Sequence, residues 1–186
     1  MIGKMFGRIG VISAVLLGLC GALLAADLPS VWLDVPFVKQ EKNGCGAASI
    51  AMVMQYWQLQ QRRSGNPTAE AAQIQRALHS DAGHGIYASD MERYFRQNGY
   101  ATFVFAGDWS DLKQHLAKGR PLIAALKPGS MVQLHYVVVA GLEPTLVLLN
   151  DPAQRKLLKQ DRSRFEQEWK GAGRWTLLAL PEAGPH

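Results

Sequence analysis

One cysteine in this sequence stands at the start of a strongly hydrophobic run. Residues 40–57 read QEKNGCGAASIAMVMQYW, and Cys45 lies between two glycines and behind Asn43. Asparagine and glycine tolerate positive φ angles, so these residues predict a tight turn. The run at 47–54 is apolar almost all round a helix, which predicts a helix that is buried on every side. The rest of the chain must therefore fold around this helix.

The position of Cys45 has two interpretations. At the N-terminus of a helix, free amides and the positive end of the macrodipole favour the thiolate, which is the nucleophilic form of cysteine. A structural cysteine is the alternative, because free cysteine is among the most buried residue types. A packing cysteine lies more often inside a helix than at its end. The local sequence alone does not decide between these interpretations.

The N-terminal segment has the pattern of an export signal. Lys4 and Arg8 precede an uncharged run at 9–26 that ends in small residues. This order is typical of a signal peptide over residues 1–26. The apolar run is long for a cleaved signal and short for a membrane helix, so an uncleaved N-terminal anchor is the alternative. We expect an exported protein, periplasmic or at the cell surface, with a single domain over residues 27–186.

Loss of this segment changes the charge and the cysteine count. The net charge falls from +5 to +3, which is too small to indicate nucleic-acid binding. Basic residues are scattered apart from a cluster at 155–164, which we expect on a solvated face. Cys20 is lost with the signal, so Cys45 becomes the single cysteine and no internal disulfide forms. A lone cysteine in an exported protein indicates intermolecular pairing or a reactive thiol.

The remaining chain predicts an α+β fold, with helices first and strands later. An extended entry segment at 28–40 leads to the Cys45 helix. Further helices are expected within residues 66–78, 89–99, 108–119 and 161–173. Strands are expected within residues 100–107, 121–129, 135–143, 145–151 and 174–181. The late strands are short and separated by turn residues, which favours an antiparallel sheet.

Two helix starts carry specific capping signals. Ser89 and Glu92 have the three-residue spacing of a capping box. Asp108 or Ser110 is expected to cap the next helix.

A loop with two histidines is a candidate metal site. His79, Asp81 and His84 lie close together in the sequence. No fourth ligand is nearby and the loop contains two glycines, so a surface loop is the favoured interpretation. We expect no metal.

A nucleophilic cysteine needs a base, and the base needs an orienting group. His135 begins the most β-prone run, HYVVVAG, and Asp151 ends the next run. The midpoint between these two residues is Glu143, inside the expected turn at 141–145, so a hairpin would make them cross-strand neighbours. His135 would take the proton of Cys45 and later protonate a leaving amine. Asp151 would hold the imidazole in its tautomer.

Gln40 completes the set of candidate site residues. It precedes Cys45 by five residues, so its side-chain amide can point at a developing oxyanion alongside the Cys45 backbone amide. Each partner alone has an ordinary explanation: His135 as a strand histidine, Asp151 as a turn former, Gln40 as a surface residue. Together, four residue types in this order favour an active site.

The same residues carry a resemblance to a known family. VPFVKQEKNGCGAASIAMVMQYW at 35–57, followed by HYVVVAG and NDP, resembles the C39-type papain-like cysteine peptidases, which include the leader-cleaving domains of bacteriocin exporters. The resemblance covers roughly residues 35–180. It implies a papain-like fold in which an N-terminal helical part, with the cysteine helix, packs on a C-terminal antiparallel sheet. The implied roles are oxyanion residue for Gln40, nucleophile for Cys45, general base and acid for His135, and orienter for Asp151.

The resemblance implies cleavage of a peptide bond in an exported peptide or protein, in the exporter branch after a double glycine. We expect a stand-alone exported monomer with a secretion system as a candidate partner, and membrane contact only through residues 1–26 if they are uncleaved. The sequence contains no GxxxxGK[ST] motif, so ATP is not expected, nor is any other cofactor. Two alternatives keep the fold: a non-catalytic peptide-binding or assembly factor, and an amidase or acyl transferase with the same dyad.

Overall fold

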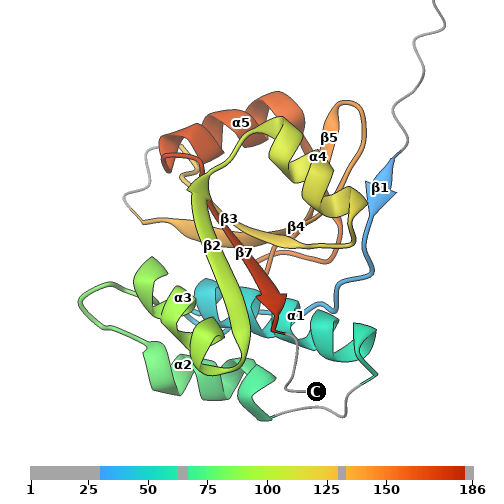
Figure 1. Ribbon diagram of the computed structural model, residues 1–186. Helices are drawn as coiled ribbons and strands as arrows, with labels where there is room; N and C mark the ends of the chain where they lie inside the picture. The colour runs from blue at the N-terminus through green and yellow to red at the C-terminus, as the bar shows by residue number, and fades with distance from the viewer. Residues whose placement is uncertain (1–29, 63–66, 130–132, 183–186) are drawn as a thin grey trace, which may run out of the picture.

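The computed structural model describes residues 30–62, 67–129 and 133–182, and it shows one antiparallel sheet with helices on both faces (Figure 1). The strands are β1 (Val31–Trp32), β2 (Tyr100–Ala106), β3 (Leu122–Leu126), β4 (His135–Leu142), β5 (Leu146–Asn150), β6 (Leu158–Asp161) and β7 (Trp175–Pro181). The helices are α1 (Cys45–Gln60), the 3-10 turn η1 (Pro67–Ala69), α2 (Ala71–Leu78), α3 (Ala88–Gln97), α4 (Trp109–Ala117) and α5 (Arg162–Gly171). The predicted signal peptide or anchor lies outside the described residues.

The sheet runs in the order β2-β7-β3-β4-β5-β6, and β1 pairs with β4. Helices α1, α2 and α3 lie on one side of it, and α4 and α5 lie on the other (Figure 1). Alternate residues of β3 face the two sides: Ile123 and Ala125 pack in the core with α1, whereas Leu122, Ala124 and Leu126 pack with α4 and α5. Burial on both faces explains why the central strands are continuous hydrophobic runs.

The predicted helix behind the tight turn is α1, and its N-terminal half is buried on every side. Its residues from Gly46 to Met54 are all buried. Two side chains near its C-terminal end bind across the fold: the Tyr56 hydroxyl donates to the Gly119 carbonyl at 2.8 Å, and the Trp57 indole donates to the Ala179 carbonyl at 2.9 Å. These bonds hold α1 against the sheet, so its N-terminus with Cys45 has a defined position.

The α+β class is confirmed, but several local predictions differ from the structure. The Ser89 and Glu92 capping box is wrong: α3 begins at Ala88 with Tyr87 as N-cap and no side-chain cap. Ser89 therefore lies inside the first turn and cannot be the N-cap, and Glu92 forms an ion pair with Arg96 one turn further along the helix.

The cap of α4 follows its prediction. The Asp108 carboxylate accepts a hydrogen bond from the Asp111 amide at 2.8 Å, and the Asp111 side chain accepts one from the Asp108 amide at 2.9 Å. The helix expected from Asn66 is instead the short turn η1 followed by α2, and Asn66 itself lies outside the described residues. The strand β6, of sequence LKQD, was not predicted because it is polar; it lies inside the basic cluster and pairs with β5.

Within the described part of the chain, no helix combines the length and the apolar character needed to cross a membrane.

Candidate active site

Cys45 is the first residue of α1, with Gly44 as its N-cap. Of the turn residues before it, Asn43 adopts a positive φ of 56° and Gly44 does not. The two glycines instead lie where a side chain would have little space. A Cβ atom on Gly44 would lie 3.1 Å from the Glu41 carbonyl oxygen, and one on Gly46 would lie 3.1 Å from the Ile86 side chain. The turn is therefore packed tightly around the start of the helix.

His135 is the first residue of β4, and its Nε2 atom lies 2.8 Å from Asp151 Oδ1. The Cys45 thiol and the imidazole interact closely enough that each shifts the pKa of the other. Since Nε2 is occupied by Asp151, Nδ1 is the ring nitrogen left for the sulfur. His135 therefore interacts with both Cys45 and Asp151.

The predicted register of the hairpin is wrong by about two residues. Val138 pairs with Asn150, so the position opposite His135 would be Ala153 rather than Asp151. The turn is shorter and later than expected, because Glu143 and Leu146 close it around Pro144, and proline favours the first central position of a turn. Next to the turn Leu142 pairs with Val147, three residues from the predicted partner, and a β-bulge near Gly141 reduces this difference to two.

Asp151 reaches His135 from a loop after β5. Its backbone amide donates to the Arg155 carbonyl at 3.2 Å, which folds the loop back. Its carboxylate also accepts from the Ala153 amide at 2.9 Å and from the Gln154 side-chain amide at 2.6 Å. These donors hold the carboxylate in place and satisfy its oxygens in a partly buried site.

Asn150 supports this loop and was not singled out by the sequence. Its side chain is fully buried, donates to the Val35 carbonyl at 3.0 Å, and accepts from the Leu157 amide at 2.9 Å. It thus ties the entry segment before Cys45 to both ends of the Asp151 loop. The signal that could have revealed it is a single polar residue at the end of the apolar run LVLLN.

Gln40 lies next to the same loop. Its backbone amide donates to the Pro152 carbonyl at 2.9 Å. Its side chain lines a cavity that Cys45 and His135 also line, and its Oε1 atom is buried without a hydrogen-bond partner among the described residues. A buried polar atom without a partner is unusual in a folded protein.

The charges of the site favour an ionised thiol. Burial opposes ionisation of Cys45, but hydrogen bonds from His135 and from the Tyr136 backbone, together with the charge on His135, lower its pKa below that of an ordinary thiol. Burial also opposes the charged form of His135, but hydrogen bonds with Asp151 and Cys45 and their negative charges raise its pKa to about 9. The hydrogen bond with His135 likewise keeps the pKa of Asp151 low despite burial. These shifts favour a thiolate paired with an imidazolium beside a carboxylate.

A cavity of about 350 Å³ opens over these residues. Its wall includes side chains that the sequence did not indicate: Gln154, Gln160, Arg164, Glu168 and His84. His84 was expected in a surface loop but contributes to this wall. His79 pairs instead with Asp81 at 3.2 Å, and the described residues contain no group of three or more His, Cys, Asp or Glu that could hold a metal ion.

Comparisons with known proteins bear on the fold and the family. The chain resembles a Bacillus anthracis protein described as a C39-like peptidase (16% identity, TM-score 0.66, covering 83% of this chain and 99% of the other). It also resembles the peptidase domain of Streptococcus ComA, a bi-functional ABC transporter involved in a quorum sensing pathway (23%, 0.61, 78% and 98%). A third similar structure is a double glycine motif protease from an AMS/PCAT transporter in complex with the leader peptide (23%, 0.62, 81% and 94%).

These likenesses confirm the predicted papain-like C39 fold. A search of curated proteins found no match to the sequence. The model of the Peptidase_C39 like family matches residues 32–176, which span the Cys45 turn, His135 and Asp151. The chain therefore belongs to the Peptidase_C39 like family.

Proposed function

We propose that this protein is a cysteine peptidase with Cys45 as nucleophile, His135 as general base and acid, Asp151 as orienting group and Gln40 as oxyanion donor. The observation that carries the proposal is the position of His135, which is hydrogen-bonded to Asp151 and lines the same cavity as Cys45. This arrangement lowers the pKa of Cys45 and so favours the thiolate, which is the reactive nucleophile.

The proposed reaction has two stages. The Cys45 thiolate attacks the carbonyl carbon of the scissile peptide bond, and the resulting oxyanion is stabilised by the Gln40 side-chain amide and the Cys45 backbone amide. The His135 imidazolium then protonates the leaving amine, which departs and leaves a thioester. In the second stage neutral His135 takes a proton from water, the hydroxide attacks the thioester, and the peptide acid is released with regeneration of the thiolate.

We propose a peptide or protein as the substrate. Support comes from the family and from the similar double glycine motif protease that was solved with a leader peptide. Cleavage after a double glycine is the first specificity to test. We further propose that the protein works after export, in the periplasm or at the cell surface, because residues 1–26 have the composition of an export signal.

The reactivity of Cys45 tests the nucleophile. The rate of alkylation of the purified protein by iodoacetamide is measured across pH, with reduced glutathione as the reference thiol. We expect fast alkylation at mildly acidic pH that His135→Ala abolishes. A pH profile like that of glutathione would contradict the proposal.

Product analysis separates peptide hydrolysis from its alternatives. Peptides with a double glycine are incubated separately with the unsubstituted protein and with Cys45→Ala, and the masses of the products are measured by mass spectrometry. Hydrolysis yields two fragments whose masses together exceed the peptide by one water. A product joined to a second amine indicates acyl transfer, and a peptide that binds but stays intact with both proteins indicates a non-catalytic binding protein.

A further inference from the structure

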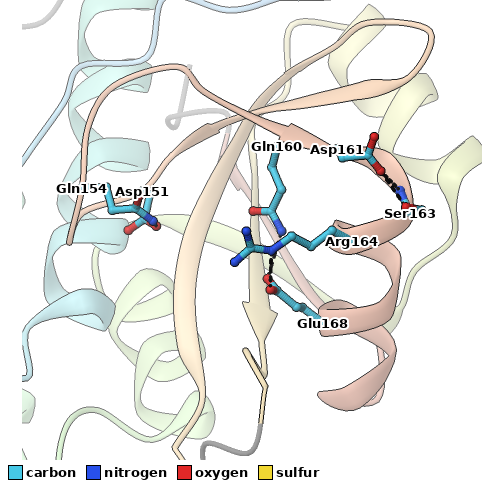
Figure 2. Close-up of polar contacts among 7 residues, drawn as sticks. All are labelled: Asp151, Gln154, Gln160, Asp161, Ser163, Arg164 and Glu168. Atoms are coloured by element: carbon cyan, nitrogen blue, oxygen red, sulfur yellow. Dashed lines mark hydrogen bonds and ion pairs between the residues drawn. The ribbon is translucent and has the colours of Figure 1, made fainter.

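Three polar side chains form a connected group on the wall of the Cys45 cavity. The Glu168 Oε1 atom accepts a hydrogen bond from Arg164 Nε at 2.9 Å (Figure 2). The other carboxylate oxygen accepts from the Gln160 side-chain amide, also at 2.9 Å. The Glu168 side chain is only 11% exposed. Both of its oxygens are therefore used inside the wall, and Glu168 itself offers little to a ligand.

Arg164 is the member of this group that is free to bind. Its side chain is 69% exposed and commits only Nε to Glu168. Within the described residues, its two terminal NH₂ groups have no hydrogen-bond partner. In Figure 2 the guanidinium extends from α5 toward the side of the view where Asp151 and Gln154 lie. Arg164, Asp151 and Gln154 line the same cavity as Cys45 and His135, so the free donors of Arg164 are available to a ligand in that cavity.

A neighbouring pair on the same helix shows what an ordinary ion pair looks like here. Arg162 donates from Nε to Glu166 at 2.8 Å with the same i,i+4 spacing. Its guanidinium lies over the Trp109 ring, 4.0 Å from the ring centre, and it does not line the cavity. That pair is explained by helix stability and packing. The pair of Arg164 and Glu168 differs in two ways. The Glu168 carboxylate is buried and accepts a second hydrogen bond from Gln160 on β6, and the Arg164 guanidinium that it holds lies at the cavity.

The chemistry of the free group indicates the ligand. A guanidinium presents parallel N–H donors that match the two oxygens of a carboxylate, and such pairs are stronger and more directional than neutral hydrogen bonds. Anchoring through Nε leaves the two terminal groups available and limits the orientations of the plane. A peptide in this cavity can supply a carboxylate from an Asp or Glu side chain or from its C-terminus.

We infer that Arg164, positioned by Glu168, is a specificity residue that binds a carboxylate of the peptide held in the Cys45 cavity. The inference rests on the proposed function for the nature of the ligand, but it concerns binding and does not require turnover. Because Arg164 is largely exposed, solvent and salt weaken the interaction. We expect a preference of about tenfold for an acidic peptide over its neutral counterpart at low salt, the scale of one charged hydrogen bond.

Binding to full-length Cys45→Ala protein tests the inference without catalysis. A proteome-derived peptide library is passed over the immobilised protein, and retained peptides are identified by mass spectrometry. Retained acidic peptides are then synthesised with Glu or Asp replaced by Gln or Asn, or with an amidated C-terminus, and their Kd values are compared. Loss of binding on side-chain replacement identifies a side-chain carboxylate, and loss on amidation identifies the C-terminal carboxylate.

Variants in the same background assign the effect to Arg164. We expect Arg164→Gln to bind acidic and neutral peptides with nearly equal Kd values. Arg164→Lys should retain part of the preference for acidic peptides. Glu168→Gln should reduce that preference because it releases the guanidinium. Arg162→Gln is the matched control and should keep the preference. Melting temperatures of all variants establish that each is folded.

Three outcomes overturn the inference: no enrichment of acidic peptides, an unchanged preference in Arg164→Gln, or an equal loss in Arg162→Gln. Failure of the proposed function has a different signature, namely slow Cys45 alkylation or no hydrolysis by the protein that retains Cys45. A protein that prefers acidic peptides but never cleaves them would retain the inference and refute the peptidase proposal.

Discussion

His135 Nε2 lies 2.8 Å from Asp151 Oδ1 although the two residues do not pair across the hairpin that contains β4 and β5. Asp151 follows the last residue of β5 and reaches the imidazole from a folded loop. Its position depends on the hydrogen bonds of that loop and on the buried side chain of Asn150. The geometry of the site is therefore sensitive to residues that do not contact the sulfur.

Asp151→Asn should lower the reactivity of Cys45. Loss of the carboxylate charge lets the pKa of His135 fall from about 9 toward its ordinary value, and the pKa of Cys45 should rise as the imidazolium is lost. Each pKa unit gained by the thiol reduces its alkylation rate at mildly acidic pH by about tenfold. The pH profile of iodoacetamide alkylation measures this change. Asp161→Asn, at the exposed N-cap of α5, should leave the profile unchanged; an unchanged profile in Asp151→Asn would refute the orienting role.

Gln40→Ala should lower kcat by about 10²–10³-fold with little change in KM, because an oxyanion donor acts mainly in the transition state. The measurement is steady-state cleavage of the peptide identified by product analysis. Lys39→Ala is a suitable control, since Lys39 is the exposed neighbour of Gln40. A raised KM with unchanged kcat would show that Gln40 binds the substrate instead.

Asn150→Ala should reduce the free energy of unfolding by about 2–3 kcal/mol. The substitution leaves the Leu157 amide and the Val35 carbonyl without their partner in a buried site. Urea unfolding measures the loss, and alkylation of Cys45 should slow as well because the Asp151 loop is released. Asn98→Ala removes a bond to the Tyr94 carbonyl at a helix end and should cost less. Equal losses in the two variants would contradict the structural role of Asn150.

The pKa shifts also predict how stability depends on pH. The folded-state pKa of His135 is raised from 6.5 to about 9, so its stabilisation is complete below pH 6.5 and is lost as the pH rises to about 9. The lowered pKa of Cys45 acts in the opposite direction. The stabilisation that ionised Cys45 contributes to the folded state is complete above pH 9.0, the ordinary pKa of the thiol, and is lost as the pH falls through the folded-state pKa.

These two contributions oppose each other in the unsubstituted protein. Cys45→Ala removes one of them and leaves His135 paired with Asp151. As the pH rises from about 6.5 to about 9, we therefore expect the free energy of unfolding of Cys45→Ala to decrease relative to that of the unsubstituted protein. Urea unfolding at several pH values measures the difference, and Cys45→Ala/His135→Ala should not show the fall. Parallel profiles for Cys45→Ala and the unsubstituted protein would be inconsistent with the ion pair.

Local patterns in the sequence determined most of the secondary structure. The apolar run after Gly46 predicts a buried helix because only an element surrounded by protein can hide apolar residues on every side. The Asp108 cap was predictable because its partner is three residues away. The polar strand β6 was not, because its pairing with β5 outweighed local preference. The Ser89 cap was wrong because α3 begins one residue earlier.

The sequence also determined which residue types could form the site, since Gln40, Cys45, His135 and Asp151 are recognisable by type and order. Only the tertiary structure decided how they meet. Packing of α1 on the sheet brings Cys45 to His135, and the bulge and the turn at Pro144 set a register that leaves Asp151 in a loop. Arg164 is a candidate specificity residue because α5 and β6 both line the cavity, and that placement depends on the tertiary structure. Contacts between residues far apart in the chain depend on the packing of whole elements, which no local pattern encodes.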